Sequence, residues 1–467
     1  MSQLTFFLSL SSIMDFNNPN INNRQFVFMR LVTEGTSVST NVMPTGNLSN
    51  SKVKIPGVFN GQNCVLGIDD EIMSKHMLVL GSTGCGKSNL FYHIIGQIKN
   101  GLQSDDVMIV FDTKGDYYDK FFNPNKDLVM GNSSQYRHSS VKWNIFKEIL
   151  ADGNNFDTYN QNCIEISKTI FSEDIEKNSA QSFFPNAACD VFASLLGAIV
   201  KRGTGHLEFK KDYYNNRALR AIFDEMDWQN LLNLLNSDLC YASSRFYIGD
   251  DPGNPQGLGV IASLQSVVRS ILQGIFADDG RFSIREFVRN RGGRTIFIEY
   301  DLSKGSIFSP IYALIIDLAL KEALGRNTKS GNVYVFCDEF RLLPKIPHME
   351  DAVNFGRSLG VKVFAGLQTI TQLSANYGNN GGKNIAAGFS TVFSFKSNDY
   401  ESRKYTTDLY GKNRVLVQTK KMTGSISEES IQANVVEDWD LEDLGIGEAI
   451  VGLPFVPPFR FQIDLYR

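Results

Sequence analysis

The chain has 467 residues, which is enough for two or three domains with a large buried core. With 42% hydrophobic and 21% charged residues, its composition is typical of a globular protein and excludes a disordered chain or a fibrous repeat. The formal net charge of -4 gives no global case for nucleic-acid binding, so any contact with DNA has to be local.

Cysteine usage and hydropathy bear on the cellular compartment. The six cysteines are scattered and form no CxxC pair, which favours reduced thiols in a cytosolic setting over disulfides or zinc. The N-terminus is apolar but serine-rich, too short to span a bilayer and without the basic start of a signal peptide. No other stretch reaches the roughly 18 to 20 apolar residues that spanning needs. We therefore expect no transmembrane segment, a cytoplasmic location, and membrane attachment only through a partner.

In chain order, residues 12–24 are Asn-rich and contain a proline, and residues 1–24 are predicted to form a flexible arm. Residues 25–32 and 53–69 have strand-like patterns. Apolar runs with the length of buried parallel strands then occur at 77–81, 106–112, 294–301, 332–340, 361–368 and 390–395. Helical patterns lie between several of these runs, so the sequence predicts an α/β domain with a mostly parallel sheet covered on both faces.

The strands stop between about residue 150 and residue 283. Apolar residues recur there at helical spacing, notably within 191–200 and 261–275. We therefore predict an all-α domain at 151–283, inserted into a nucleotide-binding domain made of 25–150 and 284–467.

Residues 81–88 read GSTGCGKS, a full match to the GxxxxGK[ST] phosphate loop. The glycines let backbone N–H groups wrap around phosphates at a helix N-terminus, where the helix dipole already favours anions. Lys87 is expected to neutralise the β and γ phosphates, and Ser88 to ligate magnesium. The alternative is a chance glycine-rich turn, which the flanking strand and helix patterns disfavour. The predicted nucleotide-binding residues are Gly81, Ser82, Thr83, Gly84, Cys85, Gly86, Lys87, Ser88 and Asn89.

A second motif is the apolar run at 332–337 that ends in Asp338 and Glu339. Asp338 is predicted to hold magnesium through its water shell, and Glu339 to orient and polarise the attacking water. An exposed strand end is the alternative, but the phosphate loop makes it the weaker one. The two motifs together predict an ATPase that uses ATP and Mg²⁺.

Three further segments carry a resemblance. They are FDTKGDYY at 111–118, WNIFKEI at 143–149, and 333–378, where an acidic pair, Leu-Pro, Gly-Arg, an apolar strand, Gln and Tyr-Gly follow in order. Together they resemble the VirD4/TraG/TraD-type coupling proteins of conjugation and type IV secretion, in the FtsK/HerA branch of P-loop ATPases. The resemblance covers roughly 60–467 and implies a RecA-like P-loop domain.

The resemblance also implies roles for two residues that the motifs alone do not single out. Gln368 would be a sensor of the γ phosphate, although a solvent-facing strand end is an alternative. Arg357 would be an arginine finger that reaches a neighbour's ATP site, whereas a lone arginine in this context is more often a surface ion pair. A finger supplied in trans requires an oligomer, and the resemblance implies a hexameric ring.

The sequence allows either a functional or a structural role for two other groups of residues. Asp112, Lys114 and Asp116 either support the phosphate site and a loop on the translocated strand, or stabilise a polar turn. A basic and aromatic cluster in the insertion can contact DNA or protein, although a solvated helix face is favoured. Its members are Phe209, Lys210, Lys211, Tyr213, Tyr214 and Arg217.

The leading hypothesis is an ATP-driven DNA translocase that delivers single-stranded or plasmid DNA with a relaxase to a conjugative secretion machinery. One alternative is a HerA/FtsK-like translocase outside secretion, and another is an ATP-gated docking adaptor in protein secretion. The N-terminal transmembrane helices and long acidic tail of some relatives are not seen in this sequence. We therefore expect peripheral attachment at the inner face of the membrane through a secretion-channel partner.

Overall fold

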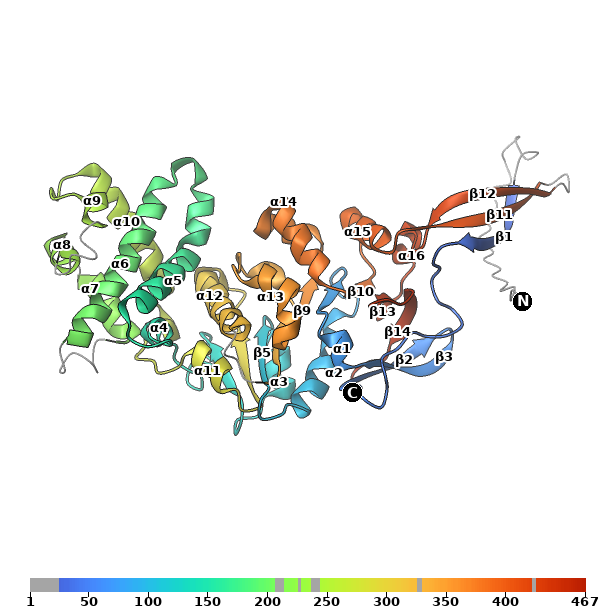
Figure 1. Cartoon of the computed structure of the whole chain (residues 1–467), viewed down its shortest axis with the longest axis horizontal. Helices are drawn as coiled ribbons and strands as arrows, with labels where there is room; N and C mark the ends of the chain where they lie inside the picture. The colour runs from blue at the N-terminus through green and yellow to red at the C-terminus, as the bar shows by residue number, and fades with distance from the viewer. Residues whose placement is uncertain (1–24, 206–213, 226–227, 237–243, 326–329, 422–425) are drawn as a thin grey trace.

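The computed structural model of the protein describes residues 25–205, 214–225, 228–236, 244–325, 330–421 and 426–467. The predicted arm at 1–24 and four members of the cluster in the insertion, residues 209–211 and 213, lie outside the described residues. A helical part occupies one end of the molecule, a large sheet with its helices the middle, and a small three-stranded sheet the other end (Figure 1).

An 11-stranded sheet forms the centre. Its parallel strands, in spatial order, are β10 (Thr391–Phe395), β4 (Met77–Leu80), β9 (Val361–Leu367), β8 (Val333–Cys337), β5 (Val107–Asp112), β7 (Arg294–Glu299) and β6 (Leu128–Gly131). Antiparallel strands continue beyond β10 as β13 (Glu448–Gly452), β14 (Phe459–Ile463), β2 (Val53–Phe59) and β3 (Gln62–Ile68). The six predicted parallel strands and the strand pattern at 53–69 are confirmed.

Helices cover both faces of the parallel strands, which explains why those strands are mostly apolar. Alternate residues of β4 enter different cores: Leu78 and Leu80 pack with the cluster that includes α12 and α13, and Met77 and Val79 with the one that includes α2. The helices around the sheet are α1 (Asp70–Met73), α2 (Lys87–Asn100), α3 (Asp116–Phe121), α12 (Gly305–Leu324), α13 (Met349–Phe355), α14 (Thr371–Gly388), α15 (Tyr400–Tyr410) and α16 (Asp438–Glu442).

The strand predicted at 25–32 is confirmed, but it lies outside the main sheet. It is β1 (Gln25–Glu34), and it pairs antiparallel with β11 (Lys412–Lys421), which in turn pairs with β12 (Ile426–Asn434). These strands form the separate three-stranded sheet that projects beside α16 (Figure 1). The sequence patterns predict neither this pairing nor the strands β6, β13 and β14.

The predicted insertion is helical in its described residues. Its helices are α5 (Phe156–Lys177), α6 (Phe183–Gly205), α7 (Asn216–Glu225), α8 (Trp228–Asn236), α9 (Arg245–Ile248) and α10 (Pro255–Ile271). Of the cluster members within the described part, Tyr214 donates its hydroxyl to the carbonyl of Val200 at 2.6 Å, whereas Arg217 is exposed.

One described helix is long and apolar enough to cross a membrane, the window Phe183–Gly203 within α6. The expectation that no stretch reaches this length is therefore wrong. However, 72% of the window is buried inside the protein, where α6 packs against α5 and α10. Core helices meet the same criterion, so this helix is weak support for a membrane span.

The chain passes between the sheet and the helical part twice, at α4 (Ile145–Ile149) and at α11 (Ile284–Asn290), and both passages meet at Glu148. Its fully buried carboxylate accepts hydrogen bonds from Trp143 Nε1 (2.9 Å), Ser283 Oγ (2.8 Å) and the Ile284 amide (2.7 Å). Burial raises the pKa of Glu148 to about 7, while these donors oppose the shift. The segment 143–149 thus fastens the two passages together.

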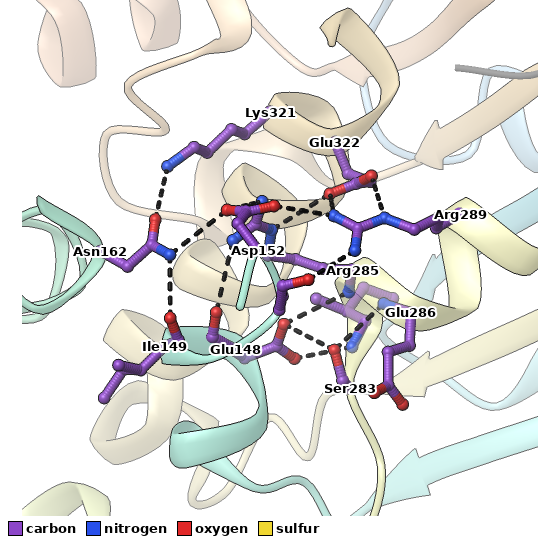
Figure 2. A network of polar contacts seen from close by, with 12 residues as sticks. Glu148, Ile149, Asp152, Asn162, Ser283, Arg285, Glu286, Arg289, Lys321 and Glu322 are labelled. Atoms are coloured by element: carbon purple, nitrogen blue, oxygen red, sulfur yellow. Dashed lines mark hydrogen bonds and ion pairs between the residues drawn. The ribbon is translucent and has the colours of Figure 1, made fainter. Parts of the chain in front are cut away.

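Ion pairs lie beside this buried carboxylate, as Figure 2 shows. Arg285 and Arg289 of α11 each bind both Asp152 and Glu322, which come from the start of the helical part and from α12. The side chains of Arg285 and Glu322 are largely buried, whereas those of Asp152 and Arg289 are partly exposed. Removal of Arg285 or Glu322 leaves the charge of the other less compensated, which is destabilising. The junction is therefore a fixed connection between the helical part and a helix that packs on the sheet.

Candidate nucleotide site

The candidate site lies where β4, β9 and β8 end. These strands are neighbours and run parallel, so their carboxyl ends meet at one edge of the sheet. In open α/β sheets this edge is where ligands bind. The sheet order therefore brings together the phosphate loop after β4, the acidic pair after β8 and Gln368 after β9.

The phosphate loop joins β4 to α2, and two glycines explain its shape. Gly84 has φ +79° and Gly86 φ +116°, a region that side-chain-bearing residues rarely adopt. A Cβ on Gly86 would lie 2.9 Å from Gly447 Cα, so the backbone approach there also requires glycine. The N-cap of α2 has no side-chain hydrogen bond, which leaves the first N–H groups of this 14-residue helix available to an anion.

Lys87 is the cation of this loop. Its ammonium group is largely buried and donates to the carbonyls of Gly81 (2.7 Å) and Ser82 (3.1 Å). The backbone of the loop therefore holds this positive charge in place. An exposed loop backbone, free helix N–H groups and one lysine fit the phosphates of a nucleotide.

The remaining predicted loop residues have varied surroundings. Cys85 is buried and its burial raises the pKa of the thiol, so it is not an activated nucleophile. Thr83 is exposed. Both polar atoms of the Asn89 side chain bind the C-terminal segment, at the Asp464 carbonyl (2.9 Å) and the Tyr466 amide (2.8 Å). The Asn89 side chain therefore fastens that segment.

Asp338, the other predicted magnesium ligand, lies directly opposite Ser88. Its Oδ2 accepts hydrogen bonds from Ser88 Oγ at 3.1 Å and from the hydroxyl of Tyr117 at 2.6 Å. Burial raises the pKa of Asp338, while these two donors and the charge of Lys87 act in the opposite direction. A hydroxyl and a carboxylate at the rim of a phosphate loop form a donor set that suits Mg²⁺.

Glu339 is held by two side chains. Arg341 donates to its Oε1 and Gln368 donates its amide to its Oε2, both at 2.9 Å. Gln368 is thus in direct contact with the predicted catalytic carboxylate, and the structure brings the two residues together. The sequence does not single out Arg341, because an arginine two residues after a carboxylate has no recognisable signature.

Arg357 does not lie at this edge. It is exposed in the turn Gly356–Leu359, which precedes β9, whereas Gln368 follows the same strand. Seven residues of extended strand separate the two ends by about 23 Å. This separation is longer than an arginine side chain can bridge, so Arg357 cannot contact the nucleotide site of its own chain.

The motif at 111–118 has a structural role that the sequence left open. Asp112 is buried and accepts hydrogen bonds from backbone amides of the following turn, which favours the polar-turn alternative. Lys114 is exposed and Asp116 is half-buried. Tyr117, which sequence reasoning missed, becomes visible only through its contact with Asp338, 221 residues away.

Comparison with known proteins finds a matching family and a curated relative. A family model described as the type IV secretion-system coupling protein DNA-binding domain matches residues 64–444. The coupling protein TraD of Escherichia coli (strain K12) is 21% identical over 364 residues, which is 74% of this chain and 45% of TraD. The chain thus spans about half the length of this curated relative.

Solved structures share the fold. The plasmid coupling protein TrwB in complex with ADP and Mg²⁺ has a TM-score of 0.70 at 20% identity, covering 94% of this chain and 95% of TrwB. VirB4 of Thermoanaerobacter pseudethanolicus has a TM-score of 0.54 at 11% identity, covering 91% and 98% of the two chains. The first likeness shows that the α/β part has the RecA-type fold of TrwB. Because the family model covers most of the residues, the chain belongs to the type IV secretion-system coupling protein DNA-binding domain family.

Proposed function

We propose that this chain is an ATP-driven DNA translocase that delivers DNA, or DNA with a bound relaxase, to a conjugative type IV secretion machinery. The observation that carries the proposal is the meeting of Lys87, the Ser88–Asp338 pair and the Glu339–Gln368 pair at one edge of the sheet. This set can bind a nucleoside triphosphate and activate water against it. The family, named for a DNA-binding domain, supplies DNA as the expected polymer.

Each residue has a definite task in this reaction. The loop backbone and Lys87 bind and orient the β and γ phosphates, and Ser88 with Asp338 would hold magnesium. Magnesium held there would supply positive charge against the phosphates. Glu339 orients a water molecule and accepts its proton as the water attacks. Gln368 donates a hydrogen bond to Glu339 and so connects the end of β9 to the carboxylate that activates the water.

Work on a polymer requires that neighbouring subunits respond to each other's nucleotide. The exposed position of Arg357 at the far end of β9 supports a role in the site of an adjacent subunit, where a guanidinium can stabilise charge on the transferred phosphoryl group. We propose a ring, six-membered as in the related ATPases, with the DNA in its centre. The need for ATP and the unpaired thiols of the described cysteines support a cytoplasmic location. The secretion channel would be the membrane partner.

Arg357→Ala is expected to keep ATP affinity but to lower turnover on the order of 10³-fold, the lower range for an arginine finger. Mixing it with Lys87→Ala tests whether the arginine acts in trans. A Lys87→Ala subunit still offers its Arg357 to an intact neighbouring site, so mixed rings should regain part of the activity. Steady-state ATPase assays of each variant and of their mixture measure this. Full activity of Arg357→Ala alone would remove Arg357 from the mechanism, and no recovery on mixing would contradict its action in trans.

The ATPase rate measured against DNA concentration tests the proposed function as a whole. A translocase couples hydrolysis to the polymer, so DNA should raise the rate. An ATP-gated docking adaptor in protein secretion would show no such response.

A further inference from the structure

The carboxylate of Asp112 is fully used by the turn that follows it. Oδ1 accepts hydrogen bonds from the amides of Lys114 (3.1 Å) and Gly115 (2.9 Å), and Oδ2 from those of Tyr117 (2.9 Å) and Tyr118 (3.1 Å). An ionised carboxylate has about four acceptor positions, so none is left for a ligand. Asp112 therefore fixes the path of the backbone into α3, and with it the position of Tyr117.

The Tyr117 side chain is held as firmly as its backbone. Its ring is buried and packs edge-on against Tyr92 of α2, with 5.5 Å between the ring centroids. From this position its hydroxyl donates to Asp338 Oδ2 at 2.6 Å. Short hydrogen bonds to an ionised oxygen are about twice as strong as those between neutral groups.

Ser88 donates to the same oxygen of Asp338, at 3.1 Å. The hydrogen bonds that described residues make with this carboxylate thus both fall on Oδ2, one from the phosphate loop and one from α3. This arrangement fixes the plane of the carboxylate and turns Oδ1 away from both donors. If Ser88 were its single donor, the carboxylate would be held by one flexible hydroxyl group and could rotate.

We propose that Tyr117 is a positioning residue for the magnesium site: its hydroxyl, placed by Asp112, orients Asp338 toward the metal. The inference rests on the proposed function, since it presupposes that Ser88 and Asp338 hold Mg²⁺. Groups that orient a metal-binding carboxylate contribute about 10- to 100-fold to metal affinity. The motif at 111–118 would then serve the nucleotide site through the metal, without touching the nucleotide.

Tyr117→Phe tests this inference, because it removes one hydroxyl and keeps the ring. Binding of a fluorescent ATP analogue is measured at increasing Mg²⁺ and in the presence of EDTA. We expect the Mg²⁺ concentration for half-maximal binding to rise about tenfold or more, and the metal-free affinity for the analogue to stay that of the wild type. Tyr118→Phe is the matched control, because it removes the hydroxyl of the neighbouring tyrosine, which does not bind Asp338. The Mg²⁺ dependence of this variant should be unchanged.

The outcomes separate the inference from the function on which it rests. A Tyr117→Phe protein with the Mg²⁺ dependence of the wild type overturns the positioning role. So does a loss of metal-free binding in this variant, because that would mean general damage to the loop. A wild-type protein that binds the analogue without any response to Mg²⁺ instead contradicts the magnesium site itself. Asp112→Asn, which weakens the hydrogen bonds of the turn, should shift the Mg²⁺ dependence in the same direction as Tyr117→Phe.

Discussion

Replacing Glu339 by glutamine is expected to lower ATP hydrolysis by about 10² to 10⁴-fold while the protein still binds ATP with magnesium. The amide has the shape of the carboxylate and can still accept the hydrogen bond that Gln368 donates at 2.9 Å in the wild type. It cannot accept a proton from the attacking water. Bound nucleotide should therefore stay uncleaved, and chromatography of the nucleotide extracted from the variant would show ATP in place of ADP.

The control for this variant is Glu401→Gln, the same change on an exposed residue of α15, which should hydrolyse ATP at the wild-type rate. Glu339 also forms an ion pair with Arg341, so a thermal unfolding curve should accompany the assay. Hydrolysis within a few-fold of the wild type by a folded Glu339→Gln protein would assign proton transfer to another group.

Lys87→Ala is expected to weaken nucleotide binding on the order of 100-fold. Deleting one partner of a desolvated, hydrogen-bonded charge pair costs about 2–5 kcal/mol, and Lys87 is the cation that the loop holds for the phosphates. Fluorescence titration with an ATP analogue measures the loss directly. A second readout is thermal stability, because a ligand that binds only the folded state raises the melting temperature, and a tighter ligand at the same concentration raises it more.

The unliganded Lys87→Ala protein should melt close to the wild type, since among the described residues the Lys87 ammonium donates its hydrogen bonds to carbonyls of its own loop. The exposed lysine in Lys383→Ala provides the matched control, and this variant should keep the full stabilisation by ATP and Mg²⁺. If Lys87→Ala were stabilised by ATP as much as the wild type, the GSTGCGKS loop would not be the nucleotide site.

Local chemistry explains what could be predicted from the sequence. The strands of the parallel sheet are mostly apolar because both faces are buried, and the phosphate loop is a continuous segment with its own glycine requirements. The acidic pair follows a strand directly, so its place at the edge of the sheet follows from the strand order. These features need no knowledge of distant contacts.

Contacts between distant segments explain what could not be predicted. β1 pairs with β11 from the opposite end of the sequence. β6 is only four residues long and, unlike the equally short β4, is not followed by a recognisable motif. The role of Tyr117 depends on its 2.6 Å contact with Asp338, and that of Asp112 on the amides of a turn. The membrane-spanning length of the apolar window in α6 is not evident from the sequence pattern, because small and polar residues interrupt the window, although its average hydropathy of 1.6 is high.

The most direct test of the account is the ATPase rate of the purified chain against DNA concentration, at several salt concentrations, with the particle mass measured by light scattering. The account predicts that DNA raises the rate to a plateau, that more DNA is needed as salt increases, and that particles close to six chains form with ATP and Mg²⁺. Glu339→Gln supplies the blank. An ATPase whose rate neither single-stranded nor double-stranded DNA changes at any salt concentration would contradict the account.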